Sequence, residues 1–220
     1  MTIRIVATSD THYPFGRDLI PDGDVLIHAG DLMYKGDPAE WEPRLESLKA
    51  QPHKRKIYVP GNHDYYPFHY RGIARSSLRR HANTELQDGL DGVVSLGKGS
   101  GLDMLAIPYV TGLPGWAYNV EEEWLAGWLR RIDMSFYQTP DIVVSHSPPW
   151  RIRDACGKEN YGSTAMNKWF YSLKNKPKLW ICGHIHESYG QEEIEGCTFA
   201  NVAMCNEEYE QVNKALVFDL

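Results

Sequence analysis

The sequence has no long apolar run, little cysteine and no surplus of positive charge. No stretch approaches the roughly 18–20 consecutive apolar residues that span a bilayer, which excludes a membrane-spanning helix. Residues 1–10 lack the basic segment and the long apolar segment of a signal peptide, so we expect a cytoplasmic protein. With 29 acidic residues against 23 basic ones, the net charge of −6 makes a long nucleic acid an unexpected partner.

Cysteines and repeats are equally sparse. The cysteines form no CxxC pair and no metal-finger spacing, so we expect buried thiols in a reducing compartment at Cys156, Cys182, Cys197 and Cys205. The chain of 220 residues has no internal repeat, no low-complexity segment and no linker rich in Gly, Ser or Pro. We therefore predict one domain over residues 1–220, without a cap domain.

Short apolar runs alternate with helix-start patterns along the chain. Five runs predict strands buried on both faces, namely 3–8, 25–28, 56–59, 142–145 and 179–182. N-cap patterns predict helices that begin after Asp37, after Asn119 and after Ser163. The stretches 93–107 and 193–220 contain short strands with no helix between them. These features predict an α/β fold, with a largely parallel part and a more strand-rich part packed in layers.

Polar side chains follow directly after each of the five predicted strands. They comprise three Asp, one Asn and five His, namely Asp10, His12, Asp31, Asn62, His63, Asp64, His146, His184 and His186. Ligands of open α/β sheets bind beyond the carboxyl ends of the strands, so we expect these side chains at one edge. Carboxylates with imidazoles suit Mn, Fe, Co, Ni or Zn. The set exceeds what one ion needs, which predicts two ions bridged by an Asp, a standard device for displacement at phosphorus.

The five motifs occur in a fixed order. Asp-x-His at 10–12, Gly-Asp at 30–31, Gly-Asn-His-Asp at 61–64, His-x-Pro-Pro at 146–149 and Gly-His-x-His at 183–186 together resemble the calcineurin-like metallophosphoesterase superfamily. The resemblance implies a four-layer α/β/β/α sandwich. It also implies one metal held by Asp10, His12, Asp31 and His186, and a second held by Asp31, Asn62, His146 and His184. His63 would then act as general acid or phosphate clamp, with Asp64 orienting it.

A narrower resemblance is to the MPPED branch of this superfamily, whose members are small phosphodiesterases without a cap domain. It rests on the segments GDVLIHAGDL, KIYVPGNHDYYP, HSPPWRIRDACG and GHIHESYG. The resemblance implies two-metal hydrolysis of a small phosphodiester, cyclic or dinucleotide-like, by a metal-bridging hydroxide. Manganese is the first choice of metal, with Fe, Zn, Ni or Co as others. The alternatives are a phosphomonoesterase or short-end nuclease and, from another class, a weakly active nucleotide-binding or scaffold protein.

Residues beside the motifs are candidates for substrate contact. Arg151 and Arg153 follow a ligand loop and could hold a phosphate, and Tyr13 could wall the pocket. Other aromatic residues on nearby loops could stack on a base or only pack, and the sequence leaves this open for Tyr65, Tyr66, Trp116, Tyr118 and Trp150.

The remaining histidines and a basic segment receive ordinary interpretations. His28 lies within an apolar run and is predicted in the core, whereas His53, His69 and His81 are predicted in solvent. A basic cluster follows the Gly-Asn-His-Asp motif and comprises Arg71, Arg75, Arg79, Arg80 and His81. We favour a solvated helix face for this cluster over a landing strip for an anion.

Overall fold

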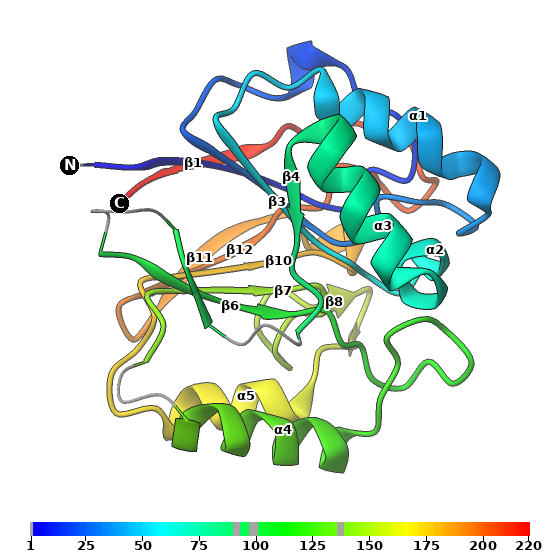
Figure 1. The fold of residues 1–220 in the computed structure, drawn as a ribbon. Coiled ribbons are helices and arrows are strands. Elements are labelled where there is room, and N and C mark those ends of the chain that lie inside the picture. Colours follow the sequence, from blue (N-terminus) through cyan, green and yellow to red (C-terminus); the bar gives the residue numbers. More distant parts are fainter. Residues whose placement is uncertain (1, 90–92, 97–100, 136–138) are drawn as a thin grey trace.

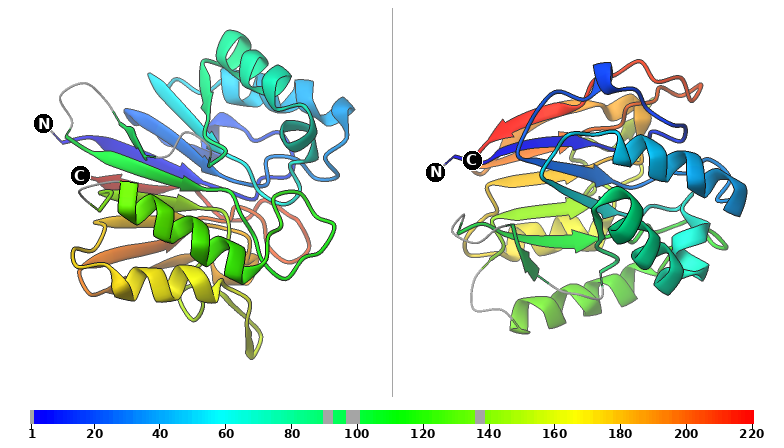
Figure 2. Two further views of the ribbon diagram at one scale, coloured as in Figure 1. Left: turned by 60° about the horizontal axis from the view of Figure 1, so that its bottom comes forward. Right: turned by 45° about the horizontal axis from the view of Figure 1, so that its top comes forward.

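The computed structural model describes residues 2–89, 93–96, 101–135 and 139–220. Two sheets face each other and helices cover their outer faces (Figures 1 and 2). The five-stranded sheet has the order β13 (Leu216–Asp219), β1 (Arg4–Thr8), β2 (Val25–Ala29), β3 (Arg55–Val59) and β4 (Thr84–Leu86). The six-stranded sheet has the order β11 (Gly190–Ile194), β12 (Cys197–Asn201), β10 (Leu179–Cys182), β7 (Ile142–Ser145), β6 (Asp103–Ile107) and β5 (Val93–Ser95).

Both sheets are parallel inside and antiparallel at an edge. Strands β1 to β4 are parallel, and β13 pairs antiparallel with β1. In the other sheet β6, β7, β10 and β12 are parallel, while β5 and β11 form antiparallel edges. The predicted division into a parallel part and a strand-rich part is therefore wrong, because the strand-rich stretches supply strands to both sheets. Residues 97–100 of the first stretch lie outside the described residues.

The alternation of side chains along the strands separates three apolar cores. Ile5 and Ile142 face the space between the two sheets, while their neighbours Val6 and Val143 face the helices outside. Helices α1 (Pro38–Lys49) and α3 (Arg71–Ser77) cover the five-stranded sheet, and α4 (Glu122–Ser135) and α5 (Thr164–Ser172) cover the other (Figure 2). The four layers confirm the α/β/β/α sandwich.

The shorter elements complete the chain. They are η1 (Arg17–Leu19), α2 (Tyr65–His69), a π-helical turn η2 (Leu78–Ala82), the hairpin strands β8 (Ala155–Cys156) and β9 (Glu159–Asn160), and η3 (His186–Ser188). Within the residues described, no helix has the length and apolar character needed to cross a membrane.

Two of the three predicted helix caps are confirmed. Asp37 accepts a hydrogen bond from the Ala39 N–H at 2.8 Å, and Ser163 Oγ accepts one from the Met166 N–H at 3.2 Å. Asn119 does not cap α4, because its side chain accepts the Leu113 N–H at 2.9 Å and thereby closes the preceding loop.

Some predictions of exposure also need correction. His53 is buried rather than solvated, and its Nε2 lies 3.1 Å from the Pro21 carbonyl oxygen. His69 and His81 are exposed, as predicted. Three cysteines are buried, but Cys156 is only partly covered because it lies in the β8–β9 hairpin.

Candidate metal centre and active site

The predicted strand ends meet at one edge of the sandwich, where the two sheets are joined by backbone hydrogen bonds. The Ser9 N–H donates to the Val202 carbonyl oxygen at 3.0 Å, and the Met204 N–H donates to that of Ser9 at 2.9 Å. These bonds connect the end of β1 with the chain beyond β12. Side chains that follow β1 to β3 and side chains that follow β7 and β10 consequently share one site.

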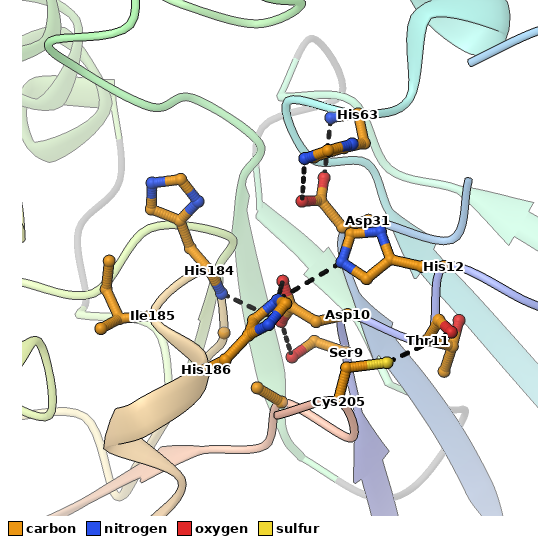
Figure 3. Close-up of polar contacts among 12 residues, drawn as sticks. Ser9, Asp10, Thr11, His12, Asp31, His63, His184, Ile185, His186 and Cys205 are labelled. Atoms are coloured by element: carbon orange, nitrogen blue, oxygen red, sulfur yellow. Dashed lines mark hydrogen bonds and ion pairs between the residues drawn. The ribbon is translucent and has the colours of Figure 1, made fainter. Parts of the chain in front are cut away.

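Asp10, His12 and His186 form the first group at this site (Figure 3). Their facing oxygen and nitrogen atoms all lie within 4.8 Å of one another. His186 Nε2 is 3.4 Å from Asp10 Oδ1 and 3.3 Å from His12 Nε2. Asp10 Oδ1 is buried and has no hydrogen-bond partner among the described residues, so it is an oxygen available to a cation.

Asp31, His146 and His184 form the second group. His146 Nε2 lies 3.3 Å from Asp31 Oδ1 and 3.0 Å from Asn62 Oδ1, so Asn62 joins this group. Asp31 also forms a cluster with His12 and His63. Asp31 therefore lies between the two groups, where a carboxylate with two oxygens can contact an ion in each.

Backbone carbonyls orient three of the imidazoles. The Nδ1 atoms of His12, His146 and His186 lie 3.0, 2.9 and 2.8 Å from the carbonyl oxygens of Met33, Ala29 and Asn206, respectively. Because a carbonyl can only accept, each Nδ1 carries the hydrogen. Nε2 is then the nitrogen that faces the site, and its lone pair is available to a cation wherever that cation replaces a proton, the arrangement found in metal-binding histidines.

The backbone at this edge is strained. The φ angles of Asp10, His12, Asp31 and His184 are 49°, 52°, 57° and 68°, in the left-handed region that residues with a side chain rarely adopt. Such strain costs about 1–3 kcal/mol per residue and concentrates at functional sites. These turns aim the side chains at a common point directly after each strand.

Two glycines keep space open between the groups. A Cβ atom on Gly61 would lie 2.3 Å from Asp31 Oδ1 and 2.6 Å from His146 Nε2. A Cβ atom on Gly183 would lie 2.1 Å from Asp10 Oδ2. A side chain at Gly61 would therefore fill the space that faces the ligand atoms, and one at Gly183 would displace the Asp10 carboxylate from its hydrogen bonds.

His63 and Asp64 have separate tasks. The His63 Nδ1 hydrogen-bonds to the Tyr34 carbonyl, and its Nε2 lies 3.9 Å from Asp31 Oδ2 at the cleft. The Asp64 carboxylate does not orient His63 as predicted. It is buried and accepts backbone N–H groups from Gly61 at 2.7 Å, Asp31 at 2.8 Å and Met33 at 2.9 Å. Asp64 therefore holds together the two loops that carry Asp31 and Asn62.

The charges of the site are tightly balanced. Burial raises the pKa of the Asp10 and Asp31 carboxyl groups, but His186 and His146 outweigh it and hold both pKa values below the ordinary range. Burial lowers the pKa of these two histidines, yet the carboxylates raise it to about 9 in both. In His12 and His184 burial prevails and the pKa is about 4. The carboxylates thus attract positive charge, which protons supply in the metal-free protein.

A cleft of about 330 Å³ opens onto this cluster. Its walls are the side chains of Asp31, Asn62, His63, Leu113, Trp116, Cys156, Tyr161, His184, Ile185, His186, Glu187, Glu207 and Tyr209. Of the aromatic residues that the sequence left undecided, Trp116 lines the cleft and its ring centroid lies 4.7 Å from that of His63.

The three residues predicted to contact substrate are not among the described residues that line this cleft. Tyr13 stacks on Tyr34 with ring centroids 5.4 Å apart. The Arg151 guanidinium lies over the Trp150 ring at 4.3 Å, and Arg153 donates to the Tyr189 carbonyl oxygen. These three residues therefore contact neighbouring side chains or backbone in this structure, and their contact with a substrate stays a prediction.

The structure also shows where His28 and the basic cluster lie. His28 is buried, with its Nε2 2.9 Å from Thr11 Oγ1, which confirms its place in the core. In the basic cluster Arg71 and Arg75 pair with the buried Asp88, whereas the other members of the cluster are exposed.

Tyr209 is a site residue that sequence reasoning missed. Its ring centroid lies 4.8 Å from that of His12 and 5.3 Å from that of His186, and its φ of 63° adds a further strained position. The stretch 193–220 is predicted to contain strands, and residues that follow such a strand, as Tyr209 follows β12, are where the other site residues also lie. The segment after β12 also supplies the Asn206 carbonyl that orients His186.

The donor set and its geometry fit divalent metal ions. Imidazole nitrogens with free lone pairs, carboxylate oxygens and an amide oxygen converge on two adjoining positions, and a buried carboxylate oxygen is available at one of them. Divalent cations would replace the protons that otherwise balance Asp10 and Asp31. Such an arrangement can hold and polarise a phosphoryl group.

Comparisons with known proteins agree with this interpretation. The family model for calcineurin-like phosphoesterases matches residues 3–188. Metallophosphoesterase domain-containing protein 1 of Homo sapiens is 28% identical over 238 residues, covering 99% of this chain and 71% of that protein. Its name is that of the MPPED branch, which confirms the predicted resemblance.

Two further proteins are similar to this chain, one in sequence and one in fold. A protein of Emericella nidulans named "Probable rhamnogalacturonate lyase C" is 28% identical over 201 residues, which cover 87% of this chain but only 18% of that protein. The crystal structure of TT1561 of Thermus thermophilus aligns with a TM-score of 0.57 at 18% identity, covering 91% of this chain and 89% of that one. At that identity the likeness shows the fold alone.

Proposed function

The chain belongs to the calcineurin-like phosphoesterase family, and from this premise we propose that it hydrolyses a small phosphodiester with the help of two divalent metal ions. Metal-dependent phosphoester hydrolysis is what family membership supports. The observation that carries the finer proposal is the position of Asp31 between two groups of ligand atoms. A carboxylate in that position can hold two ions about 3.5–4 Å apart, the spacing used for displacement at phosphorus.

We propose four ligands for each ion, with Asp31 shared between the two. Asp10, His12, Asp31 and His186 would hold one, and Asp31, Asn62, His146 and His184 would hold the other. Bound divalent ions lower the pKa of water and neutralise charge on phosphoryl oxygens. We favour manganese as the first choice, while a set of two carboxylates, one amide oxygen and four imidazoles also suits Fe, Co, Ni or Zn.

We assign to His63 the role of assisting the leaving group. The Tyr34 carbonyl holds its Nδ1, so Nε2 is the nitrogen presented to the cleft. In the imidazolium form, Nε2–H can give its proton to the departing ester oxygen and leave a neutral imidazole, or it can donate a hydrogen bond to a phosphoryl oxygen. A positioned acid of this kind contributes about 10²–10⁴ in rate.

The size and walls of the cleft favour a small diester. Its volume of about 330 Å³ suits a small molecule rather than a long polymer. Leu113, Trp116 and Tyr161 offer apolar and aromatic surface beside the ligand cluster, on which a nucleobase can stack. We therefore propose a cyclic or dinucleotide-like substrate.

Hydrolysis of two chromogenic esters tests this function. The protein is stripped with a chelator, and bis-p-nitrophenyl phosphate is compared with p-nitrophenyl phosphate as Mn²⁺, Ni²⁺ or Zn²⁺ is added back. We expect no cleavage without metal and a preference for the diester with it. A preference for the monoester would instead identify a phosphomonoesterase, and cleavage that survives removal of the metal would contradict the proposal.

A further inference from the structure

The cleft is acidic apart from its ligand cluster. Among the residues that line it in the described part of the chain, none is Lys or Arg, while Glu187 and Glu207 add two carboxylates. The nearby arginines point elsewhere, since Arg151 lies over Trp150 and Arg153 binds the Tyr189 carbonyl. Among the described residues that line the cleft, no Lys or Arg is therefore present to pair with a second anionic group of a substrate.

Both acids lie next in sequence to residues at the same ligand, His186. Glu187 directly follows His186, and Glu207 directly follows Asn206, whose carbonyl oxygen lies 2.8 Å from His186 Nδ1. This hydrogen bond brings the two acids to one corner of the cleft. The Cys156 thiol donates to Glu187 Oε1 at 2.9 Å and holds that carboxylate beside the wall.

The loop that carries Glu207 is also ordered. Asn206 Oδ1 accepts the N–H groups of Glu208 at 3.1 Å and Glu210 at 2.8 Å, and the Tyr209 N–H donates to the Asn206 carbonyl oxygen at 3.0 Å. The left-handed backbone of Tyr209 turns its ring onto His12 and His186. One short loop thus contributes both an aromatic wall and a negative charge.

The other walls of the cleft are apolar or aromatic. Leu113, Trp116, Tyr161, Ile185 and Tyr209 line it together with the two acids. This surface can contact a flat organic group, but the described residues that line it offer that group no cation with which to pair. A second phosphate or carboxylate on the substrate would lie near the negative charge of Glu187 or Glu207, with no Lys or Arg among the described lining residues to offset the repulsion.

We propose that this cleft selects phosphodiesters whose organic group is uncharged or cationic, and that Glu187 and Glu207 reject esters with a second anionic group. The inference rests on the proposed function and narrows its substrate class. It favours simple nucleoside esters or cyclic nucleotides over nucleotides that bear an additional phosphate.

The size of the effect follows from the exposure of the two acids. Glu187 and Glu207 are exposed, so their repulsion acts in a medium close to water and each should change selectivity about three- to tenfold. Exposed charges are screened over about 10 Å at 0.1 M salt. The selectivity should therefore be largest at low ionic strength and decline as salt is added.

A matched pair of substrates isolates the remote charge. Thymidine 5′-(p-nitrophenyl phosphate) and its 3′-phosphate share the reacting diester and the leaving group, and they differ only by one phosphate. We would measure kcat/KM for both with Mn²⁺-loaded wild type, with the Glu187→Gln/Glu207→Gln double variant, and with Glu193→Gln. Glu193 is an exposed acid on β11 that does not line the cleft, and it serves as the control.

We expect wild type to prefer the ester without the 3′-phosphate by at least about tenfold at low salt. The double variant should lose most of this preference, Glu193→Gln should keep it, and 0.5 M NaCl should reduce it. Equal or faster cleavage of the 3′-phosphate by wild type, or an unchanged preference in the double variant, would overturn the inference.

A binding measurement distinguishes failure of this inference from failure of the proposed function. Thymidine 5′-phosphate and thymidine 3′,5′-bisphosphate differ by the same remote phosphate, and their affinities can be measured by calorimetry without turnover. If the metal-loaded protein cleaves neither diester, the proposed function fails, and these affinities still decide charge selection. Weaker binding of the bisphosphate by wild type, restored in the double variant, supports the inference, whereas tighter binding by wild type refutes it.

Discussion

A methyl group placed at Gly61 should disrupt the metal centre without changing a ligand. The Cβ of Gly61→Ala would lie 2.3 Å from Asp31 Oδ1 and 2.6 Å from His146 Nε2. Non-bonded carbon contacts are normally about 3.5 Å, so these atoms must move by about 1 Å. Metal sites tolerate about 0.2 Å in ligand distance, and we therefore expect the affinity for Mn²⁺ to fall at least about 100-fold.

Gly72→Ala is the matched control. Gly72 lies in α3, its added Cβ meets no atom within 4 Å, and neither glycine has a left-handed backbone. Alanine in the helix should stabilise the fold by about 0.5–1 kcal/mol and leave metal affinity unchanged. Calorimetric titration of the chelator-stripped proteins with Mn²⁺, beside thermal unfolding, provides the test. Wild-type Mn²⁺ affinity in Gly61→Ala would refute the assignment of this space to metal.

Three further changes probe the catalytic histidine, the loop carboxylate and the charge balance. His63→Ala should lower kcat about 10²–10⁴-fold while the metal content, measured by elemental analysis, stays unchanged. Asp64→Asn should lower the free energy of unfolding in urea by about 2–4 kcal/mol. Its amide oxygen can replace only one of the two carboxylate oxygens, so its NH₂ would face either the buried Met33 N–H or those of Gly61 and Asp31. The free energy of unfolding of the metal-free protein should decrease as the pH rises from 7.5 to 9. In the folded protein His146 and His186 have pKa values of about 9 and still bind protons in this range, whereas the same histidines in the unfolded chain have already released theirs. Thermal unfolding across this pH range should show a loss of up to about 1.4 kcal/mol per pH unit for each histidine, and no such loss with Mn²⁺ bound.

A specific result would contradict each of these three predictions. Loss of metal in His63→Ala would make that residue a ligand. Wild-type stability in Asp64→Asn would show that its hydrogen bonds to the two loops matter little. A metal-free protein whose stability is constant or rises from pH 7.5 to 9 would contradict the pairing of the two histidines with Asp10 and Asp31, because a raised histidine pKa can only stabilise the fold on the acid side.

The ligand cluster could be predicted from sequence because it follows from parallel strands. Each strand is a short apolar run, the carboxyl ends of parallel strands meet at one edge, and the polar residues come directly after the runs. The helix that begins at Pro38 is likewise local, since Asp37 and a following proline determine where it begins. These features depend on neighbours in the chain.

The errors come from contacts between distant residues. Asp64 lies beside His63 in sequence, yet its carboxylate accepts hydrogen bonds from the N–H groups of Asp31 and Met33, which are 33 and 31 residues away. Arg153 follows a ligand loop, but its guanidinium donates to the Tyr189 carbonyl oxygen, which lies 36 residues further along the chain. The edge strands β5, β11 and β13 join whichever sheet edge is adjacent in space, and short strands carry no local pattern that specifies their partner.

The central claim, that two ions share Asp31, is tested most directly by counting bound metal against activity. Chelator-stripped wild type and Asp31→Asn would be titrated with Mn²⁺ while bound ions per chain and diester hydrolysis are measured together. We expect wild type to bind two ions and to become active only as the second one binds, and we expect Asp31→Asn to lose both ions and all activity. Full activity with one ion per chain, or two ions retained in Asp31→Asn, would contradict the account.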